Sequence, residues 1–206
     1  MRGPPRGGGR KRATVYPERS LTPHTPALRS LKSDAYSTFR HCMTLSIRPA
    51  VPADSALIHQ FIRDLAEYEK LLHQVRATEQ GMAEILFGPS PRAFCDIAEV
   101  DGAPVGFALW FYNVSTFEGR HGIYLEDLFV KPEARGAGAG KALLRRLAQR
   151  CRDEGLARLE WAVLDWNAPS IAFYDSLGAS AKTDWITRRL SGEALEKLAE
   201  VVPAKA

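Results

Sequence analysis

The chain has 206 residues, of which 45% are hydrophobic and 25% charged, a composition typical of a soluble globular domain. No apolar run approaches the roughly 18 residues that a membrane-spanning helix needs. The net charge of +4 is unevenly placed, because residues 1–42 carry nine Lys/Arg and two acidic residues, whereas the other 164 residues carry 19 basic and 22 acidic ones. A slightly negative folded part disfavours a nucleic-acid-binding domain and suits a cationic substrate.

Residues 1–42 are rich in Pro, Gly, Arg, Ser and Thr and show no sustained periodicity. We predict a disordered basic extension followed by one domain over residues 43–206. Two alternatives stay open: the Arg-rich, acid-poor stretch has the composition of an organelle transit peptide, and Met43 could be the true start of translation. The stretch lacks the apolar segment of a secretory signal, so a cytoplasmic location is expected.

The three cysteines are Cys42, Cys95 and Cys151. Their number is odd, their spacing is wide, and none has a histidine at metal-binding distance along the chain. The sequence therefore predicts reduced thiols and no metal site.

Apolar residues from Met43 onward recur with the spacing of strands and helices. An alternating stretch comes first, Pro52 suits the first turn of a helix, and Asp101-Gly102 suits a hairpin turn. The elements predicted in this half are a strand over Met43–Arg48, a helix over Pro52–Leu72, a helix over Thr78–Leu86, and hairpin strands over Ala93–Val100 and Val105–Asn113.

Strands and helices alternate in the second half of the chain. The predicted elements are a strand over Gly122–Val130, a helix over Lys141–Cys151, a strand over Ala157–Val163, a helix over Asn167–Ser176, a strand over Ala181–Leu190 and a helix over Ser191–Val201. Strands paired first by a hairpin and then alternating with helices predict an α/β fold with a mixed sheet.

A glycine-rich loop, Arg135–Gly140 (RGAGAG), lies between a predicted strand and a predicted helix. Glycines allow backbone N–H groups to approach a ligand closely, and a helix N-terminus adds partial positive charge, so this loop suits a phosphate group. A P-loop is excluded, since it needs glycine in place of Arg135 and Ser or Thr in place of Ala142. The dinucleotide fingerprint is excluded as well, because its last glycine would fall on Lys141.

A second informative run is Trp161–Ala179, reading WAVLDWNAPSIAFYDSLGA. Asn167 can cap a helix that has Pro169 in its first turn and Gly178 at its end. Tyr174 lies one turn before that glycine. It is either an aromatic packed against the sheet or a proton donor in a reaction.

Taken together, LEDLFV, RGAGAGK and the N-x-P-S-I-x-F-Y-x-x-L-G-A run resemble the GNAT N-acetyltransferases over about residues 43–206. IRPA, LAEYEKLLHQV, YLEDLFV and WNAPSIAFY are similar to the diamine (spermidine/spermine) branch of that superfamily. The resemblance implies an α/β GNAT fold with a mixed, mostly antiparallel sheet whose central strands splay at the acetyl-CoA site. It also implies acetyl-CoA as cosubstrate, a small amine substrate, a homodimer, and no nucleic-acid or membrane partner.

The resemblance assigns roles to individual residues. Tyr174 matches the general acid, and Glu126 is the carboxylate predicted to take the proton of the amine. Positions that match the cofactor site are Leu128, Phe129, Val130, Arg135, Gly136, Ala137, Gly138, Ala139, Gly140, Lys141, Asn167, Pro169 and Ser170. Positions that match or approximate substrate contacts are Tyr68, Glu69, Glu126, Trp161 and Asp184. The chain departs from the family pattern in the short segment after Gly178-Ala179, which bears on the shape of the substrate pocket.

These residues suit acetyl transfer by direct attack. An alkylammonium has a pKa near 10 and must lose a proton before it can attack. The sequence shows no Ser/His/Asp arrangement and no Cys/His pair that a covalent intermediate would use. We expect an N-acetyltransferase for a diamine, a polyamine or a lysine-like amino acid. The alternatives are another acceptor amine (an antibiotic, a protein lysine or an N-terminus), a non-catalytic CoA-binding regulator, and a nucleic-acid binder acting through the basic extension.

Overall fold

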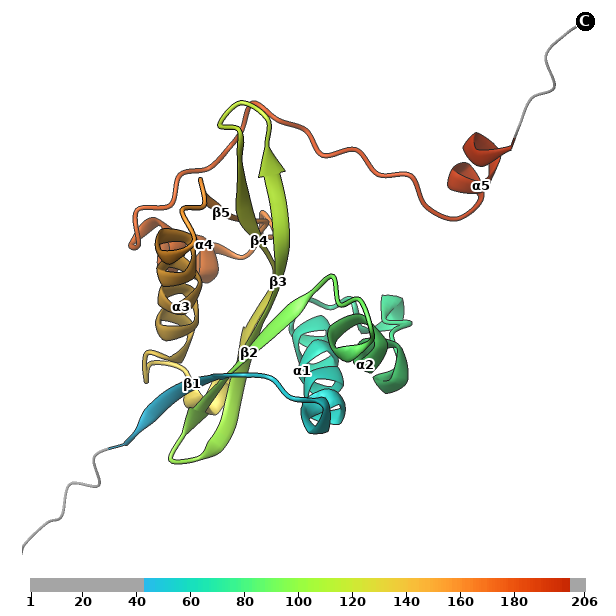
Figure 1. The fold of residues 1–206 in the computed structure, drawn as a ribbon. Helices are drawn as coiled ribbons and strands as arrows, with labels where there is room; N and C mark the ends of the chain where they lie inside the picture. Colours follow the sequence, from blue (N-terminus) through green and yellow to red (C-terminus); the bar gives the residue numbers. More distant parts are fainter. Residues whose placement is uncertain (1–42, 201–206) are drawn as a thin grey trace, which may run out of the picture. The chain divides into compact units, whose positions relative to one another are not determined.

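The computed structural model describes residues 43–200, so the predicted extension and Cys42 lie outside the described residues. One sheet organises this part of the chain, with strand order β1-β2-β3-β4-β5 (Figure 1). The strands are β1 Leu45–Pro49, β2 Phe94–Val100, β3 Ala103–Ser115, β4 Arg120–Val130 and β5 Leu159–Trp161. The first three pairings are antiparallel and β4–β5 is parallel, which confirms the predicted mixed, mostly antiparallel sheet.

Helices cover both faces of the sheet (Figure 1). The covering helices are α1 Ser55–Tyr68, α2 Glu79–Phe87, α3 Ala139–Asp153 and α4 Ala168–Asp175. A further helix, α5 Glu193–Ala199, is exposed, and short 3₁₀ turns are η1 Pro52–Asp54, η2 Leu72–Gln74 and η3 Pro132–Ala134. Phe61 of α1 packs with Phe107 and Phe129 in one core, and Leu143 and Leu147 of α3 belong to a second core. None of the helices in residues 43–200 is both long and apolar enough to cross a membrane.

Local signals predicted several boundaries correctly. Asp101 and Gly102 both have positive φ, of 52° and 78°, as the predicted hairpin turn requires. The Thr78 side chain accepts a hydrogen bond from the Gly81 N–H at 3.1 Å and so caps α2. Each of these turns depends on residues close together in the chain.

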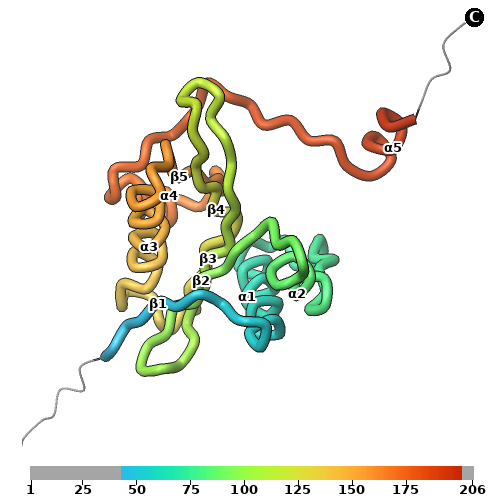
Figure 2. Tube along the Cα trace, in the orientation of Figure 1, coloured from blue at the N-terminus to red at the C-terminus, as the bar shows by residue number. Residues whose placement is uncertain are grey.

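A β-bulge in β4 changes which face of the sheet the side chains around it point toward. Leu109 of β3 pairs with Asp127 and Trp110 pairs with Leu125, so Glu126 is an extra residue in β4. The parallel pairing with β5 covers only 123–125, and no described strand pairs with 126–130 on that side. The two strands therefore part at the bulge, as expected for splayed central strands; Figure 2 shows the chain passing from β4 through α3 to β5.

The predicted strand over Ala181–Leu190 is wrong. This segment has no regular secondary structure, every residue in it is exposed, and Trp185 and Ile186 keep 75% and 76% of their surface exposed. Alternating side chains indicate which strand faces would be apolar, but a strand also needs backbone hydrogen-bonding partners, and no described strand pairs with this segment. β5 is likewise shorter than the predicted Ala157–Val163.

Candidate active site

The glycine loop presents unpaired backbone donors at the start of α3. Gly136 and Gly138 have φ of 84° and 86°, a conformation that favours glycine, and Gly138 is the N-cap without any side-chain cap. The Ala142 N–H donates to the Gly138 carbonyl at 2.9 Å, so the N–H groups of residues 139–141 precede the first helical hydrogen bond. These donors and the helix dipole suit an anionic group such as a phosphate.

Gly140 serves a different purpose from the other two glycines. It lies within α3, and a Cβ there would be 3.8 Å from Val130 Cγ2 and 3.9 Å from Phe173 Cζ, which are ordinary contacts. Neither backbone conformation nor packing within the chain therefore requires glycine at this position. Close approach of a ligand is a remaining physical reason for it.

Three predicted site residues from distant segments meet in one network. The Arg135 guanidinium lies over the Tyr68 ring, with Cζ 4.8 Å from the ring centroid, and Nε donates to the Val130 carbonyl at 3.1 Å. The Tyr68 hydroxyl donates to Asn167 Oδ1 at 3.1 Å. The ends of β4 and α1 and the start of α4 are thus joined by side chains.

Asn167 caps α4 as predicted. Its Oδ1 accepts the Ser170 N–H at 3.3 Å, Pro169 lies in the first turn, and the Asn167 side chain is buried. The cap fixes the start of the helix that carries Tyr174.

Tyr174 lies half-buried with its ring 5.0 Å from that of Trp161. Burial, and to a smaller extent the charge of Glu69, raises the pKa of the Tyr174 hydroxyl. The group therefore keeps its proton at neutral pH and is able to donate it. No hydrogen bond to this hydroxyl is present within residues 43–200, so it is free to meet a ligand.

Three carboxylates come together around Asp127, and we call Glu69, Glu126 and Asp127 the acidic cluster; the charge of Glu69 also acts on Tyr174. Burial raises the pKa of Glu69. Burial, then the charges of Glu126 and Glu69, raises the pKa of Asp127 to about 7. The charges of Glu126 and Glu69 thus disfavour the ionised form of Asp127, a repulsion that a nearby cation would relieve.

Sequence reasoning missed Asp127. Its signal was present, since Asp127 and Glu126 are two adjacent acidic residues between apolar ones at the end of a strand, Leu125–Val130. Strict alternation would place Glu126 and Asp127 on opposite faces of the sheet. The bulge at Glu126 removes that alternation, and only the pairing of β3 with β4 shows the bulge.

The structure gives less direct support for the predicted ligand contacts of two residues, Asp184 and Phe129. Asp184 is exposed in the C-terminal segment and has no hydrogen bond or ion pair within residues 43–200, so its contact with substrate stays a prediction. The Phe129 side chain is 4% exposed and lies in the core, 6.0 Å from the Phe61 ring. The Phe129 side chain is therefore mainly a core residue, and its backbone is the part that a ligand along β4 would pair with.

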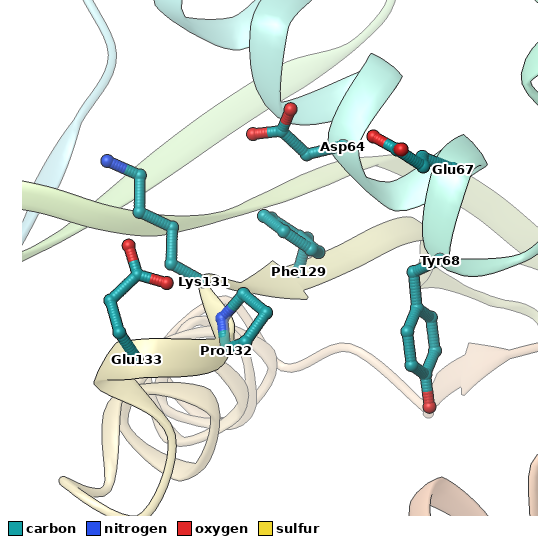
Figure 3. Close-up of a pocket in the computed structure, with 7 residues that line it drawn as sticks. All are labelled: Asp64, Glu67, Tyr68, Phe129, Lys131, Pro132 and Glu133. Atoms are coloured by element: carbon teal, nitrogen blue, oxygen red, sulfur yellow. The ribbon is translucent and has the colours of Figure 1, made fainter.

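A cavity of about 350 Å³ opens on the α1 side of the site (Figure 3). Tyr68 is its only member from the network around Arg135, and neither Tyr174 nor the acidic cluster lines it. The residues lining it are Asp64, Glu67, Tyr68, Phe129, Lys131, Pro132 and Glu133. The cavity thus lies beside the acidic cluster rather than around it.

Metal ligands and reactive thiols do not stand out in the described part of the chain. Residues 43–200 hold no group of three or more His, Cys, Asp or Glu that could bind a metal ion. Cys95 is buried and Cys151 half-buried, and burial raises the pKa of both thiols. A thiol with a raised pKa is a poor nucleophile at neutral pH.

A mixed sheet whose strands β4 and β5 part at a bulge, with a glycine loop opening the helix that follows β4, is the arrangement of one class of acetyltransferases. Residues 58–179 match the acetyltransferase (GNAT) family, and the chain belongs to that family. It is an N-acetyltransferase related to the diamine branch.

Individual relatives narrow the comparison. The chain is 41% identical to a thialysine N-epsilon-acetyltransferase of Bos taurus over 164 residues, covering 74% of this chain and 96% of the relative. It is 31% identical to an L-ornithine N5-acetyltransferase of Arabidopsis thaliana, covering 90% and 96%. Among solved structures, an integron cassette protein from the mobile metagenome of V. cholerae superposes with a TM-score of 0.65 at 28% identity, covering 77% and 99%.

Proposed function

We propose that the protein transfers the acetyl group of acetyl-CoA to a primary amine of a small cationic molecule, a lysine-like amino acid or a diamine. The observation that carries this proposal is the acidic cluster, whose Glu69 acts on Tyr174. Carboxylates whose charges act on one another at Asp127 would attract an ammonium group and repel acidic acceptors. The names of the relatives support the same substrate class, since thialysine and ornithine both carry a side-chain amine.

The residues of the glycine loop fit acetyl-CoA, which supplies the acetyl group as a thioester. The N–H groups of residues 139–141 and the Arg135 guanidinium would hold its pyrophosphate. The backbone of 128–130, which no strand pairs on the β5 side, would hydrogen-bond its pantetheine arm. Asn167 and Ser170 would line the other side of the opening between β4 and β5.

The acidic cluster would accept the proton that the amine must lose. The substrate arrives as an ammonium with a pKa near 10 and must become neutral before attack. Glu126 stays the predicted base. Asp127, with a pKa of about 7, is a second candidate, because a general base works best with a pKa near the working pH.

Tyr174 would supply the opposite proton transfer. A tyrosine hydroxyl is protonated at neutral pH at its ordinary pKa near 10, and burial and Glu69 raise the pKa of Tyr174 further. The proton would pass from the hydroxyl oxygen to the departing sulfur, while the amine nitrogen forms the new bond to the acetyl carbon. Both proton transfers then use side chains of one chain.

Replacement of Gly140 by alanine tests the cofactor site. The new Cβ makes only ordinary contacts, and alanine is favoured over glycine within a helix by about 1 kcal/mol, so stability should be kept or improved. A methyl group between the backbone and the pyrophosphate should weaken acetyl-CoA binding by roughly tenfold or more. Calorimetric binding and thermal unfolding of the same samples measure both effects.

Gly140→Ala is a sharper test than a change at Gly138. Because Gly138 has a φ of 86°, a β-branched residue there would strain the backbone, so the fold and the site would change together. Alanine at Gly81 in α2 is a control for acetyl-CoA affinity only, because its Cβ would lie 3.2 Å from Thr78 Oγ1 and so would disturb the cap of α2. Unchanged acetyl-CoA affinity in Gly140→Ala would show that the phosphate does not lie against this residue.

A panel of amines tests the substrate class. We expect lysine, thialysine, ornithine and short diamines to be acetylated with a kcat/KM at least about tenfold above that of a neutral-tailed monoamine. Release of free CoA thiol gives the rate for each amine at equal acetyl-CoA. A preference for an antibiotic, a protein lysine or an N-terminus would replace this substrate class, and no turnover with any amine would favour a non-catalytic regulator.

A further inference from the structure

We propose that Tyr68 is a positioning residue that couples binding of the cofactor to binding of the amine. The inference rests on the proposed function, which places Arg135 and Asn167 on acetyl-CoA and Glu69 beside the amine. Tyr68 contacts Arg135 and Asn167 and directly precedes Glu69 in the chain. It is therefore the point where the two halves of the site meet.

The ring of Tyr68 holds Arg135 for the phosphate. The guanidinium is fixed on one side by the bond from Nε to the Val130 carbonyl, at 3.1 Å, and on its face by the Tyr68 ring, at 4.8 Å. Its remaining N–H groups make no hydrogen bond within residues 43–200, and the side chain is exposed. A pyrophosphate that pairs with these donors fixes the guanidinium plane and so the ring beneath it.

The hydroxyl of Tyr68 holds the start of α4. It donates at 3.1 Å to Asn167 Oδ1, the same oxygen that accepts the Ser170 N–H at 3.3 Å. Asn167 is 6% exposed and Tyr68 is half-buried, so this bond is partly buried. Because α4 carries Tyr174, the hydroxyl of Tyr68 links the end of α1 to the helix of the proposed general acid.

The chain after Tyr68 is held rigidly. α1 ends in a C-cap in which the Lys70 N–H donates to the Glu67 carbonyl at 3.0 Å and the Leu71 N–H to the Ala66 carbonyl at 2.7 Å. Lys70 has a φ of 62°, which costs a non-glycine residue strain. Glu69 is the C-cap residue itself, directly bonded to Tyr68, so a change in the position of Tyr68 is passed to Glu69 through the backbone.

These contacts predict that binding of the cofactor affects binding of the amine, and that binding of the amine affects binding of the cofactor. A bound pyrophosphate orders Arg135, then Tyr68, and through the shared backbone Glu69, which stands beside the amine. If bound cofactor raises the affinity for the amine by some factor, bound amine must raise the affinity for the cofactor by the same factor. Ring contact with Trp166, at 6.2 Å between centroids, adds a second support for the orientation of Tyr68.

Titration calorimetry with CoA and 1,3-diaminopropane tests the coupling. CoA lacks the acetyl group, so the complex with both ligands forms without turnover. In the unaltered full chain, the affinity for CoA should be about fivefold or more higher with saturating diamine than without it, and this ratio of affinities measures the coupling. In Tyr68→Phe, which keeps the ring under Arg135 but removes the bond to Asn167, this ratio should fall to near one.

Two further variants keep the test decisive. Tyr112→Phe removes a hydroxyl that donates to Glu154 at 2.6 Å, away from the site, and should keep the full ratio. Asn167→Ser keeps a capping hydroxyl for α4 but shortens the side chain away from Tyr68, and should lose the ratio even if Tyr68→Phe does not fold.

The outcomes separate the two proposals. Full coupling in Tyr68→Phe and Asn167→Ser would overturn the inference, as would an unaltered protein that binds both ligands independently, and the proposed function would stand in either case. An unaltered protein that binds no CoA would overturn the proposed function and the inference with it.

Discussion

Tyr174→Phe is expected to lower kcat by about 10²–10⁴-fold, the usual contribution of a general acid. The phenylalanine ring keeps the 5.0 Å contact with Trp161, so the fold and the affinity for acetyl-CoA should change little. Only the hydroxyl is lost. Burial and Glu69 keep that hydroxyl protonated in the parent protein, which is the state that donates a proton to the departing sulfur.

Steady-state thiol release with a diamine measures kcat, and near-ultraviolet circular dichroism monitors packing. Tyr112→Phe is the matched control, because it also removes one hydroxyl from a partly exposed tyrosine, whose partner is Glu154. A Tyr174→Phe rate within twofold of the parent rate would assign Tyr174 to packing alone.

Asp127→Asn is expected to raise the free energy of unfolding at pH 8 while it lowers activity. Burial and the charges of Glu126 and Glu69 disfavour the ionised form of Asp127 and raise its pKa from 3.8 to about 7. An amide of nearly the same shape removes that repulsion. In the parent protein, the ionised Asp127 is thus predicted to serve catalysis while it lowers the stability of the fold.

The direction in which stability changes with pH follows from the number of protons bound by the folded and unfolded states. Below about pH 4 Asp127 is protonated in both states, and above about pH 7 it is charged in both; between these values the folded state binds the proton that the unfolded state has released. The contribution of Asp127 to stability therefore falls as pH rises from 4 to 7, by an amount on the order of 4 kcal/mol. Asp127→Asn should consequently raise Tm by roughly 10 °C at pH 8 and have little effect at pH 4.

Activity should change in the opposite direction. The carboxylate that accepts a proton is the ionised form, so the parent kcat/KM should fall as pH drops below about 7. Asp127→Asn should lower kcat/KM for a diamine by about 10²-fold and remove that part of the pH profile.

Differential scanning calorimetry at both pH values and a pH–rate profile test the pair of effects. Asp153→Asn, at an exposed carboxylate paired with Arg152, serves as the control and should alter neither. A Tm unchanged at pH 8 would contradict the placement of a disfavoured charge at Asp127. Stabilisation with full activity would leave Glu126 as the base without help from Asp127.

The sequence by itself determined the parts of this protein that depend on neighbouring residues. The hairpin turn at Asp101-Gly102, the Asn167 cap of α4 and the glycine loop ahead of α3 were all predicted correctly, because side chains within a few residues set these backbone angles and caps. The motifs around Tyr174 likewise predicted the GNAT family, which the family match confirms.

Only the tertiary structure decided the rest, because it depends on partners far apart in the chain. Tyr68 and Asn167 are 99 residues apart, and nothing local to either one predicts their hydrogen bond. Asp127 joins the acidic cluster through a bulge that exists only when β3 pairs with β4. The alternation of Ala181–Leu190 predicted a strand, yet the segment stays irregular, since a β-strand forms only where another strand completes its backbone hydrogen bonds.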